Sequence, residues 1–184
     1  MAVEFEENSA CQSIGSYAFY YSEALESINL PATIETSLPH VYASQVEYMH
    51  KNLKYRENVL ISLHPHNDRG TGVADTELAL LAGADRVEGT LFGNGERTGN
   101  VPLEAMVFEY ASLRGSLDGM DTTVITEIAD FFKKDVGYNI PPMTPFTGSA
   151  FNVTRAGVHA DGLMKDEEIY TIFDTKKILN KPAT

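Results

Sequence analysis

The motif that most constrains the fold of this chain is LHPHNDRG, residues 63–70, which continues an apolar run over residues 58–63. The run is short and rich in aliphatic side chains, which predicts a buried β-strand. Side chains two residues apart on a strand point to the same face, so we expect His64 and His66 side by side at its C-terminal end. Two imidazoles placed this way could bind one divalent cation, although two incidental histidines in a surface loop would give the same pattern.

Strand-like and helix-like segments alternate on both sides of this motif. The strand candidates are residues 3–5, 29–35, 58–63 and 86–92, and the helix candidates are residues 13–27, 40–53, 73–82 and 102–113. Strands that alternate with helices of about a dozen residues predict an α/β fold with a parallel sheet and right-handed crossovers. Two architectures fit: half of an eight-stranded barrel, or a four-stranded doubly wound sheet.

The pattern changes beyond residue 115. Residues 121–136 predict an amphipathic helix, and the proline-rich residues 139–147 predict an extended linker. Residues 151–184 are too few to form a core alone, so we expect them to dock on another surface. Within them, Asp161 could orient the imidazole of His159 as a general base, although most lone histidines are merely accommodated by the fold.

The composition of the 184 residues excludes several classes of protein. A formal net charge of −12 argues against nucleic-acid binding, because phosphate recognition needs clustered lysine and arginine. The single cysteine, Cys11, cannot form a disulfide within the chain. No signal peptide is recognisable, and no apolar run reaches the roughly 18 residues of a membrane span. We therefore expect a cytoplasmic protein that does not contact a membrane.

Polar side chains follow several of the predicted strands. Thr33 offers a hydroxyl and Asn100 an amide oxygen, and with His64 and His66 they suit a catalytic divalent ion that polarises a carbonyl. Such an ion also needs a carboxylate, and none of the nearby acids is the obvious donor. Asp68 is predicted to cap the following helix rather than to support a histidine.

The acid-base pair in the loop after residue 92 leaves two interpretations open. Glu96 and Arg97 could pair with each other or with Glu88, which would be a structural arrangement, or they could serve catalysis. The loop itself, residues 93–100, has no third glycine at the spacing of a dinucleotide-binding motif, so a nucleotide site is not predicted.

Three ordered motifs resemble the 2-isopropylmalate synthase and homocitrate synthase family: NLPATIE at residues 29–35, HPHNDRG at residues 64–70 and GNGERTGN at residues 93–100. These enzymes are metal-dependent TIM barrels of the DRE-TIM type, which condense acetyl-CoA with a 2-oxo acid. The resemblance implies that residues 1–115 form the C-terminal half of a TIM barrel, about strands five to eight. It also implies that residues 116–184 form a helix and a small linker subdomain.

The resemblance also implies roles for five residues of the barrel half. His64, His66 and Asn100 would hold a divalent metal ion, which would be Mg²⁺, Mn²⁺ or Zn²⁺. Thr33 would contact the carboxylate of the 2-oxo acid. Glu96 would line the side of the site that receives acetyl-CoA.

Two residues of the C-terminal segment complete the implied site. His159 resembles a catalytic histidine that the adjacent subunit of a homodimer contributes, and Tyr170 is a candidate for the tyrosine that accompanies it. The family's first strand carries an Arg-Asp-Gly motif whose aspartate binds the metal, and this chain has no such strand. A family glutamate that follows strand five would fall near Glu7 or Asn8, and an ungapped match places Asn8 there. The resemblance therefore implies that activity requires an N-terminal barrel half that is missing here.

Details of the motifs point to a branch of the family and leave other functions open. The early motifs resemble isopropylmalate synthases, whereas HADG at residues 159–162 resembles the homocitrate branch; this mixture is similar to Re-type citrate synthase, which uses oxaloacetate. The alternatives are an inactive binding or dimerisation module, and an aldolase-type lyase on the same barrel.

Overall fold

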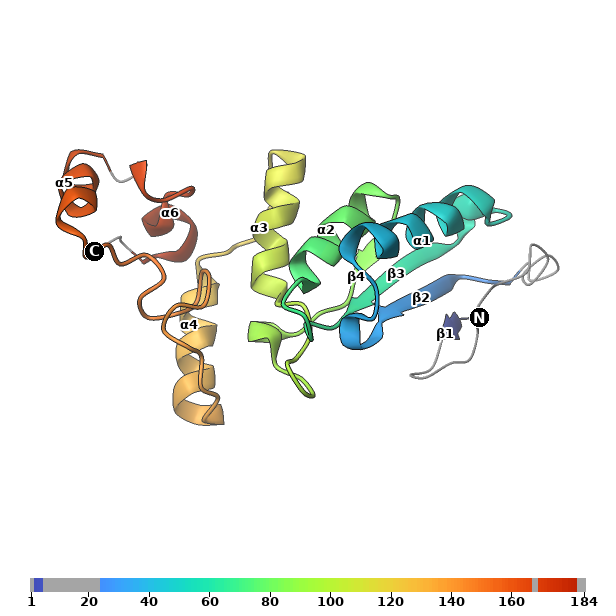
Figure 1. Cartoon of the computed structure of the whole chain (residues 1–184), viewed down its shortest axis with the longest axis horizontal. Coiled ribbons are helices and arrows are strands. Elements are labelled where there is room, and N and C mark those ends of the chain that lie inside the picture. Colours follow the sequence, from blue (N-terminus) through green and yellow to red (C-terminus); the bar gives the residue numbers. More distant parts are fainter. Residues whose placement is uncertain (1, 5–23, 167–168, 182–184) are drawn as a thin grey trace. The chain divides into compact units, whose positions relative to one another are not determined.

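The computed structural model describes residues 2–4, 24–166 and 169–181, and the chain divides into two compact units, Met1–Glu109 and Tyr110–Thr184. Unit 1 contains a four-stranded sheet in which every neighbouring pair of strands is parallel. The strands are β1 (Ala2–Glu4), β2 (Ser27–Ala32), β3 (Leu60–Pro65) and β4 (Arg86–Val87). They pair in sequence order (Figure 1), without the reversal that defines a doubly wound sheet. The α/β prediction is confirmed, and this order is that of consecutive barrel strands.

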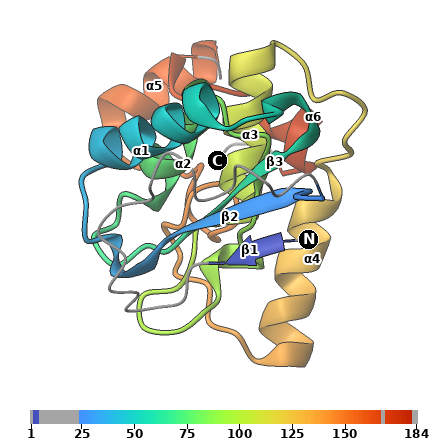
Figure 2. The same cartoon turned by 90° about the vertical axis from the view of Figure 1, so that its right-hand side faces the viewer.

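Two helices cover one face of the sheet in unit 1. Helices α1 (Pro39–Asn52) and α2 (Gly72–Leu81) lie side by side above β2 and β3 (Figure 2). In α1 the buried residues Tyr42, Val46 and Met49 recur every three or four positions, which places them on one side of the helix. They pack with Ile28 and Ile61 of the sheet in the main hydrophobic core. The helices predicted over residues 40–53 and 73–82 are confirmed, as is the third, α3 (Leu103–Arg114).

The opposite face of the sheet carries polar side chains. Residues at the same register on neighbouring parallel strands point to the same face, and Asn29 is level with Ser62, which is level with Arg86. One step further along β3 is His64, which is level with Pro31. This face lacks the two covering helices and corresponds to the interior of a closed barrel. The polar side chains of this face therefore lie next to His64.

Two predicted strands end earlier than the sequence pattern indicated. The strand expected over residues 29–35 ends at Ala32 and continues as a 3₁₀ turn, Thr33–Glu35, whose central Ile34 has a φ of 49°. The strand expected over residues 86–92 is limited to β4, and a second 3₁₀ turn occupies Leu91–Gly93. Of the helix expected over residues 13–27, residues 13–23 lie outside the described part, and its predicted end is wrong because Ser27 begins β2.

Unit 2 is helical. After the end of α3, its described residues contain α4 (Val124–Phe131), a short π-helical turn (Phe132–Val136), α5 (Gly157–Lys165) and α6 (Thr175–Leu179). The hydroxyls of Thr122 and Thr126 donate to the carbonyls of Ile178 and Leu179 at 2.7 and 2.6 Å, which attaches α6 to α4. The helix predicted over residues 121–136 is confirmed in its central part.

The proline-rich segment of unit 2 is folded into turns. The amide of Thr144 donates to the carbonyl of Pro141 at 3.1 Å, and the amide of Gly148 donates to the carbonyl of Thr144 at 2.9 Å. The expectation of an extended linker over residues 139–147 is therefore wrong, because these local hydrogen bonds close the backbone on itself. No helix in the described ranges combines the length and the apolar character needed to cross a bilayer.

Candidate active site

The histidine pair lies at the C-terminal end of β3. His64 is in the strand and His66 follows it directly, and their ring centroids are 5.5 Å apart. Both side chains are half-buried. The spacing of two residues thus places the two imidazoles side by side, as the sequence predicted.

The glycine-rich loop is attached to this strand end by backbone hydrogen bonds. The amide of Asn67 donates to the carbonyl of Gly99 at 3.0 Å, and the amide of Val101 donates to the carbonyl of Pro65 at 3.0 Å. Between these bonds, His66 and Asn100 form an isolated antiparallel bridge. Asn100 is therefore held next to His66, although 33 residues separate them in the sequence.

Gly99 is required by the geometry of this loop. Its φ is +87°, and a Cβ atom at this position would lie 1.8 Å from the carbonyl oxygen of Gly93. The same carbonyl accepts a hydrogen bond of 3.1 Å from the amide of Asn100. The close approach that positions Asn100 is thus available only to glycine.

A buried glutamate ties the turn after β2 to the segment after His66. The side chain of Glu35 accepts hydrogen bonds from the hydroxyl and the amide of Thr71, at 2.7 and 3.1 Å, and from the amide of Arg69. These bonds hold Ile34 and Glu35 at positive φ. This conformation is unusual for residues other than glycine, and most of all for the β-branched Ile34. Thr33, the predicted substrate contact, begins this turn and therefore lies at the same edge of the sheet as the histidines.

A second glutamate, which the sequence analysis did not connect to the histidines, lies beside His64. The carboxylate of Glu88 accepts hydrogen bonds from Asn29 Nδ2 at 2.9 Å, Ser62 Oγ at 2.6 Å and Arg86 Nη2 at 2.8 Å. Its Oε2 is 3.5 Å from His64 Nδ1. Partial burial acts to raise the pKa of Glu88, but the hydrogen bonds outweigh it and lower the pKa below the usual range. The sequence did contain one sign of this arrangement, because Arg86 and Glu88 are two residues apart and would point to the same face of an extended strand.

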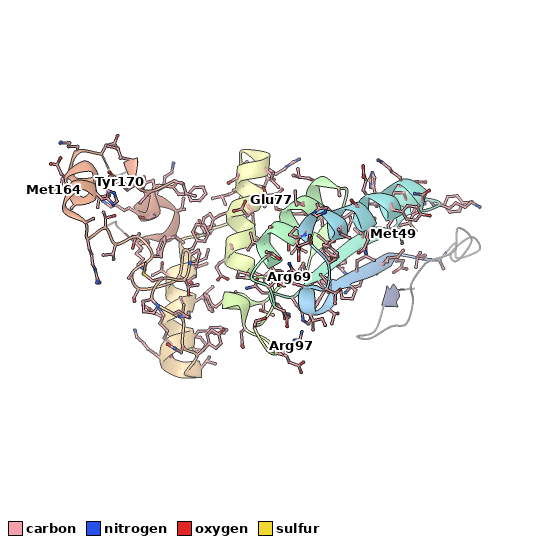
Figure 3. The ribbon with its side chains drawn as sticks, viewed as in Figure 1. Met49, Arg69, Glu77, Arg97, Met164 and Tyr170 are labelled. Atoms are coloured by element: carbon pink, nitrogen blue, oxygen red, sulfur yellow. The ribbon has the colours of Figure 1, made fainter. Side chains whose placement is uncertain are left out.

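Arg97 links the glycine-rich loop to the histidine segment. Its Nε donates to Asp68 Oδ1 at 2.8 Å, its Nη2 contacts His66 Nδ1, and its Nη1 is 3.8 Å from Glu96 (Figure 3). Of the pairings considered for Arg97, the structure contains the one with Glu96, whereas Glu88 binds Arg86 instead. Glu96, a predicted catalytic residue, has a side chain that is 87% exposed.

The prediction that Asp68 caps α2 is wrong. The residue before α2 is Thr71, and the Asn67 side chain accepts the hydrogen bond from the amide of Gly72 at 3.1 Å. Asp68 instead binds Arg97, whose hydrogen bond lowers the pKa of the Asp68 carboxyl. Its Oδ2 also lies 3.9 Å from His66 Nδ1, which makes Asp68 a neighbour of a histidine after all.

The predicted catalytic residues of unit 2 lie together. The ring centroids of His159, in α5, and Tyr170 are 4.8 Å apart. Asp161 does not orient the histidine as the sequence suggested, since its carboxylate binds Lys165 at 2.6 Å. The two aromatic side chains form a local pair at the surface of this unit, where both are exposed.

The donors of the candidate site fit a divalent metal ion that still lacks a carboxylate. His64 and His66 offer two imidazoles, and the amide oxygen of Asn100, whose backbone pairs with His66, would complete a mixed nitrogen and oxygen set that suits borderline to hard cations. Within residues 2–4, 24–166 and 169–181, no three histidine, cysteine or carboxylate side chains are grouped in a way that could hold a metal ion. The set is therefore compatible with a metal ion but is not a closed metal centre.

The parallel sheet with strands in sequence order and polar residues at its C-terminal edge belongs to the α/β class. The family model described as HMGL-like matches residues 10–132, and this chain belongs to the HMGL-like family. The HMG-CoA lyase from Acenitobacter baumannii, solved with coenzyme A and 3-methylmalate, has a similar fold. The TM-score is 0.52 at 23% sequence identity, over 66% of this chain and 41% of that one.

Relatives with higher sequence identity are synthases. The chain is 54% identical over 138 residues to the 2-isopropylmalate synthase of Helicobacter hepaticus, which covers 75% of this chain and 25% of that protein. It is also 54% identical over 123 residues to the citrate (Re)-synthase of Clostridium kluyveri, which covers 67% of this chain and 27% of that protein. The chain thus spans about a quarter of the length of these curated relatives.

Proposed function

We propose that this chain supplies part of the active site for a metal-dependent Claisen condensation of acetyl-CoA with a 2-oxo acid. The observation that carries the proposal is the attachment of the glycine-rich loop to β3, which brings Asn100 to the histidine pair. The names of the two synthase relatives support an acetyl-CoA-dependent condensation. In this proposal residues 1–115 correspond to barrel strands five to eight, and residues 116–184 form the linker subdomain.

The residues of unit 1 would bind and orient the 2-oxo acid. His64, His66 and Asn100 would hold Mg²⁺, Mn²⁺ or Zn²⁺, which when bound supplies Lewis-acid polarisation of the ketone. Thr33 would donate its hydroxyl to the substrate carboxylate. Glu96, exposed on the loop, would face acetyl-CoA.

The pair in unit 2 would move the proton. His159 would accept a proton from the methyl group of acetyl-CoA, and Tyr170, 4.8 Å away between ring centroids, would hold the imidazole in place. A new carbon–carbon bond then forms between this methyl carbon and the ketone carbon, and the ketone oxygen takes up a proton. Water cleaves the thioester, which releases CoA and a 2-hydroxy acid with one more carboxylate. We propose that a second copy of the chain provides this pair in a homodimer.

A thiol-release assay tests the proposal. The chain is incubated with acetyl-CoA and Mg²⁺ or Mn²⁺, and oxaloacetate, 2-oxoisovalerate and 2-oxoglutarate are offered separately. If this chain completes an active site by itself, CoA is released with one of these acids and the release is lost in His64→Ala. Exposed His40, on α1, provides the matched control His40→Ala, which should retain release. Silence with all three acids in a folded preparation would contradict catalysis by this chain alone.

The second candidate function is an inactive binding or dimerisation module. One observation favours it: in the part of the chain that the structure describes, no carboxylate joins the histidines as a third metal ligand. A module of this kind would bind a partner copy without releasing CoA. A dimer in sedimentation that releases no CoA would support the module, whereas CoA release by the same preparation would exclude it.

Replacement of Asp68 is expected to weaken metal binding at the histidine pair. In Asp68→Asn the positive charge of Arg97 beside His66 would lose its compensating carboxylate, and the site would repel a cation. We expect the Mn²⁺ affinity to fall about tenfold, as is typical when a partner of a ligand is removed. Titration calorimetry measures this, with Asp118→Asn in unit 2 as the control. Equal affinities for wild type and Asp68→Asn would contradict the role given to this aspartate.

A further inference from the structure

The carboxylate of Glu88 is held by side chains from three strands. Asn29 lies in β2, Ser62 in β3 and Arg86 in β4, and each donates a hydrogen bond to it. Ser62 and Arg86 both donate to Oε1, whereas Asn29 donates to Oε2. Three donors from three strands fix the position of this carboxylate more firmly than a surface ion pair would.

Only Oε2 of this carboxylate faces the histidine. It lies 3.5 Å from Nδ1 of His64. An ionised carboxylate can accept a hydrogen bond but cannot donate one. The separation is longer than an ordinary hydrogen bond, so the carboxylate acts on the imidazole mainly through its charge. A negative charge at this place stabilises the tautomer that carries its proton on Nδ1.

We infer that Glu88 is a positioning residue that keeps the proton of His64 on Nδ1 and leaves the lone pair of Nε2 free to bind a cation. The inference rests on the proposed function, because it specifies which nitrogen of His64 would face the metal ion. Metal-binding histidines generally donate their second ring N–H to a carboxylate or carbonyl, which fixes both the tautomer and the ring orientation. Among the residues that the structure describes, Glu88 is the carboxylate that lies beside a ring nitrogen of His64.

The tautomer can be observed without any metal. Long-range ¹H–¹⁵N correlation spectra of the ¹⁵N-labelled 184-residue chain, recorded above the usual pKa of histidine, distinguish a protonated from an unprotonated ring nitrogen. For wild type we expect protonated Nδ1 and unprotonated Nε2 in His64. A wild-type spectrum with the proton on Nε2 would overturn the inference, whatever the behaviour of the variants.

Two matched variants test whether Glu88 is the cause. In Glu88→Gln the charge is lost, so we expect the population of His64 to move toward the tautomer protonated on Nε2. Glu57→Gln makes the same chemical change at an exposed position and should leave the spectrum of His64 as in wild type. An unchanged His64 tautomer in folded Glu88→Gln would show that another group fixes the proton, and the inference would fail.

Addition of Zn²⁺ to the same samples separates this inference from the proposed function. If the wild-type tautomer is as inferred, the resonance of the unprotonated Nε2 should shift on Zn²⁺ binding, and Glu88→Gln should bind about tenfold more weakly. The inferred tautomer without any shift would overturn the proposed metal site and leave the role of Glu88 standing. A shift of Nδ1 in place of Nε2 would contradict the role of Glu88 and support the metal site.

Discussion

Gly99→Ala is expected to lower the free energy of unfolding by about 3 kcal/mol and to separate Asn100 from the histidines. Two costs add at this position. The φ of +87° strains any residue with a side chain, and the new Cβ would lie 1.8 Å from the carbonyl oxygen of Gly93. That carbonyl is backbone and accepts the amide of Asn100, so it cannot move aside without loss of this hydrogen bond.

Gly70→Ala is the matched control for this prediction. Its φ is +76°, but a Cβ there would have no atom within 4 Å, so only the backbone strain of about 1 kcal/mol remains. Urea denaturation of both variants measures the difference, and the amide resonances around His66 report whether the loop has moved. Equal losses in the two variants would show that the close approach of Gly93 and Gly99 is not important for stability.

The helices and the parallel sheet could be predicted because their signals are local, whereas the pattern of residues left the order of the strands open between two architectures. The apolar spacing of Tyr42, Val46 and Met49 specifies α1 within a single segment, and the alternation of strands and helices specifies a parallel sheet. The turn after β2 could not be predicted in the same way. Ile34 and Glu35 leave the extended conformation because Glu35 binds Thr71, which lies 36 residues further along the chain.

The candidate site was also predicted only in part. The histidine pair follows from the spacing of two residues, and the sequence also favoured Asn100 and Thr33 because they follow other strands. The two supporting carboxylates were missed, because Glu35 and Glu88 reach the site through the register of neighbouring strands and loops. Sequence alone did not establish that Asn29 and Ser62 are level, and this register is what directs Glu88 toward His64.

A buried acid pair under the histidine segment should make stability depend on pH. Asp75 of α2 is 1% exposed, and its Oδ1 has no hydrogen-bond partner. Burial, together with the nearby carboxylate of Glu35, raises the pKa of Asp75 to about 6, and the opposing charge of Arg69 only partly offsets this. The difference from the value of 3.8 for a free aspartate corresponds to about 3 kcal/mol.

The sign of the effect follows from where the proton is held. Between about pH 4 and about pH 6 the folded chain keeps the proton on Asp75 and the unfolded chain does not, so stability falls as the pH rises through this window. Asparagine is neutral throughout. We therefore expect Asp75→Asn to gain stability relative to wild type across the window, and to exceed it by about 3 kcal/mol near neutral pH.

Urea denaturation of wild type and Asp75→Asn from about pH 4 to about pH 8 measures this difference. The difference between the two curves is the informative quantity, because other acids such as Glu104, whose burial raises its pKa, titrate equally in both proteins. Asp118→Asn is the control of opposite sign: a hydrogen bond from Tyr110 lowers the pKa of Asp118, so this variant should lose a little stability above that pKa. Parallel curves for wild type and Asp75→Asn would show that the folded chain holds no extra proton at Asp75.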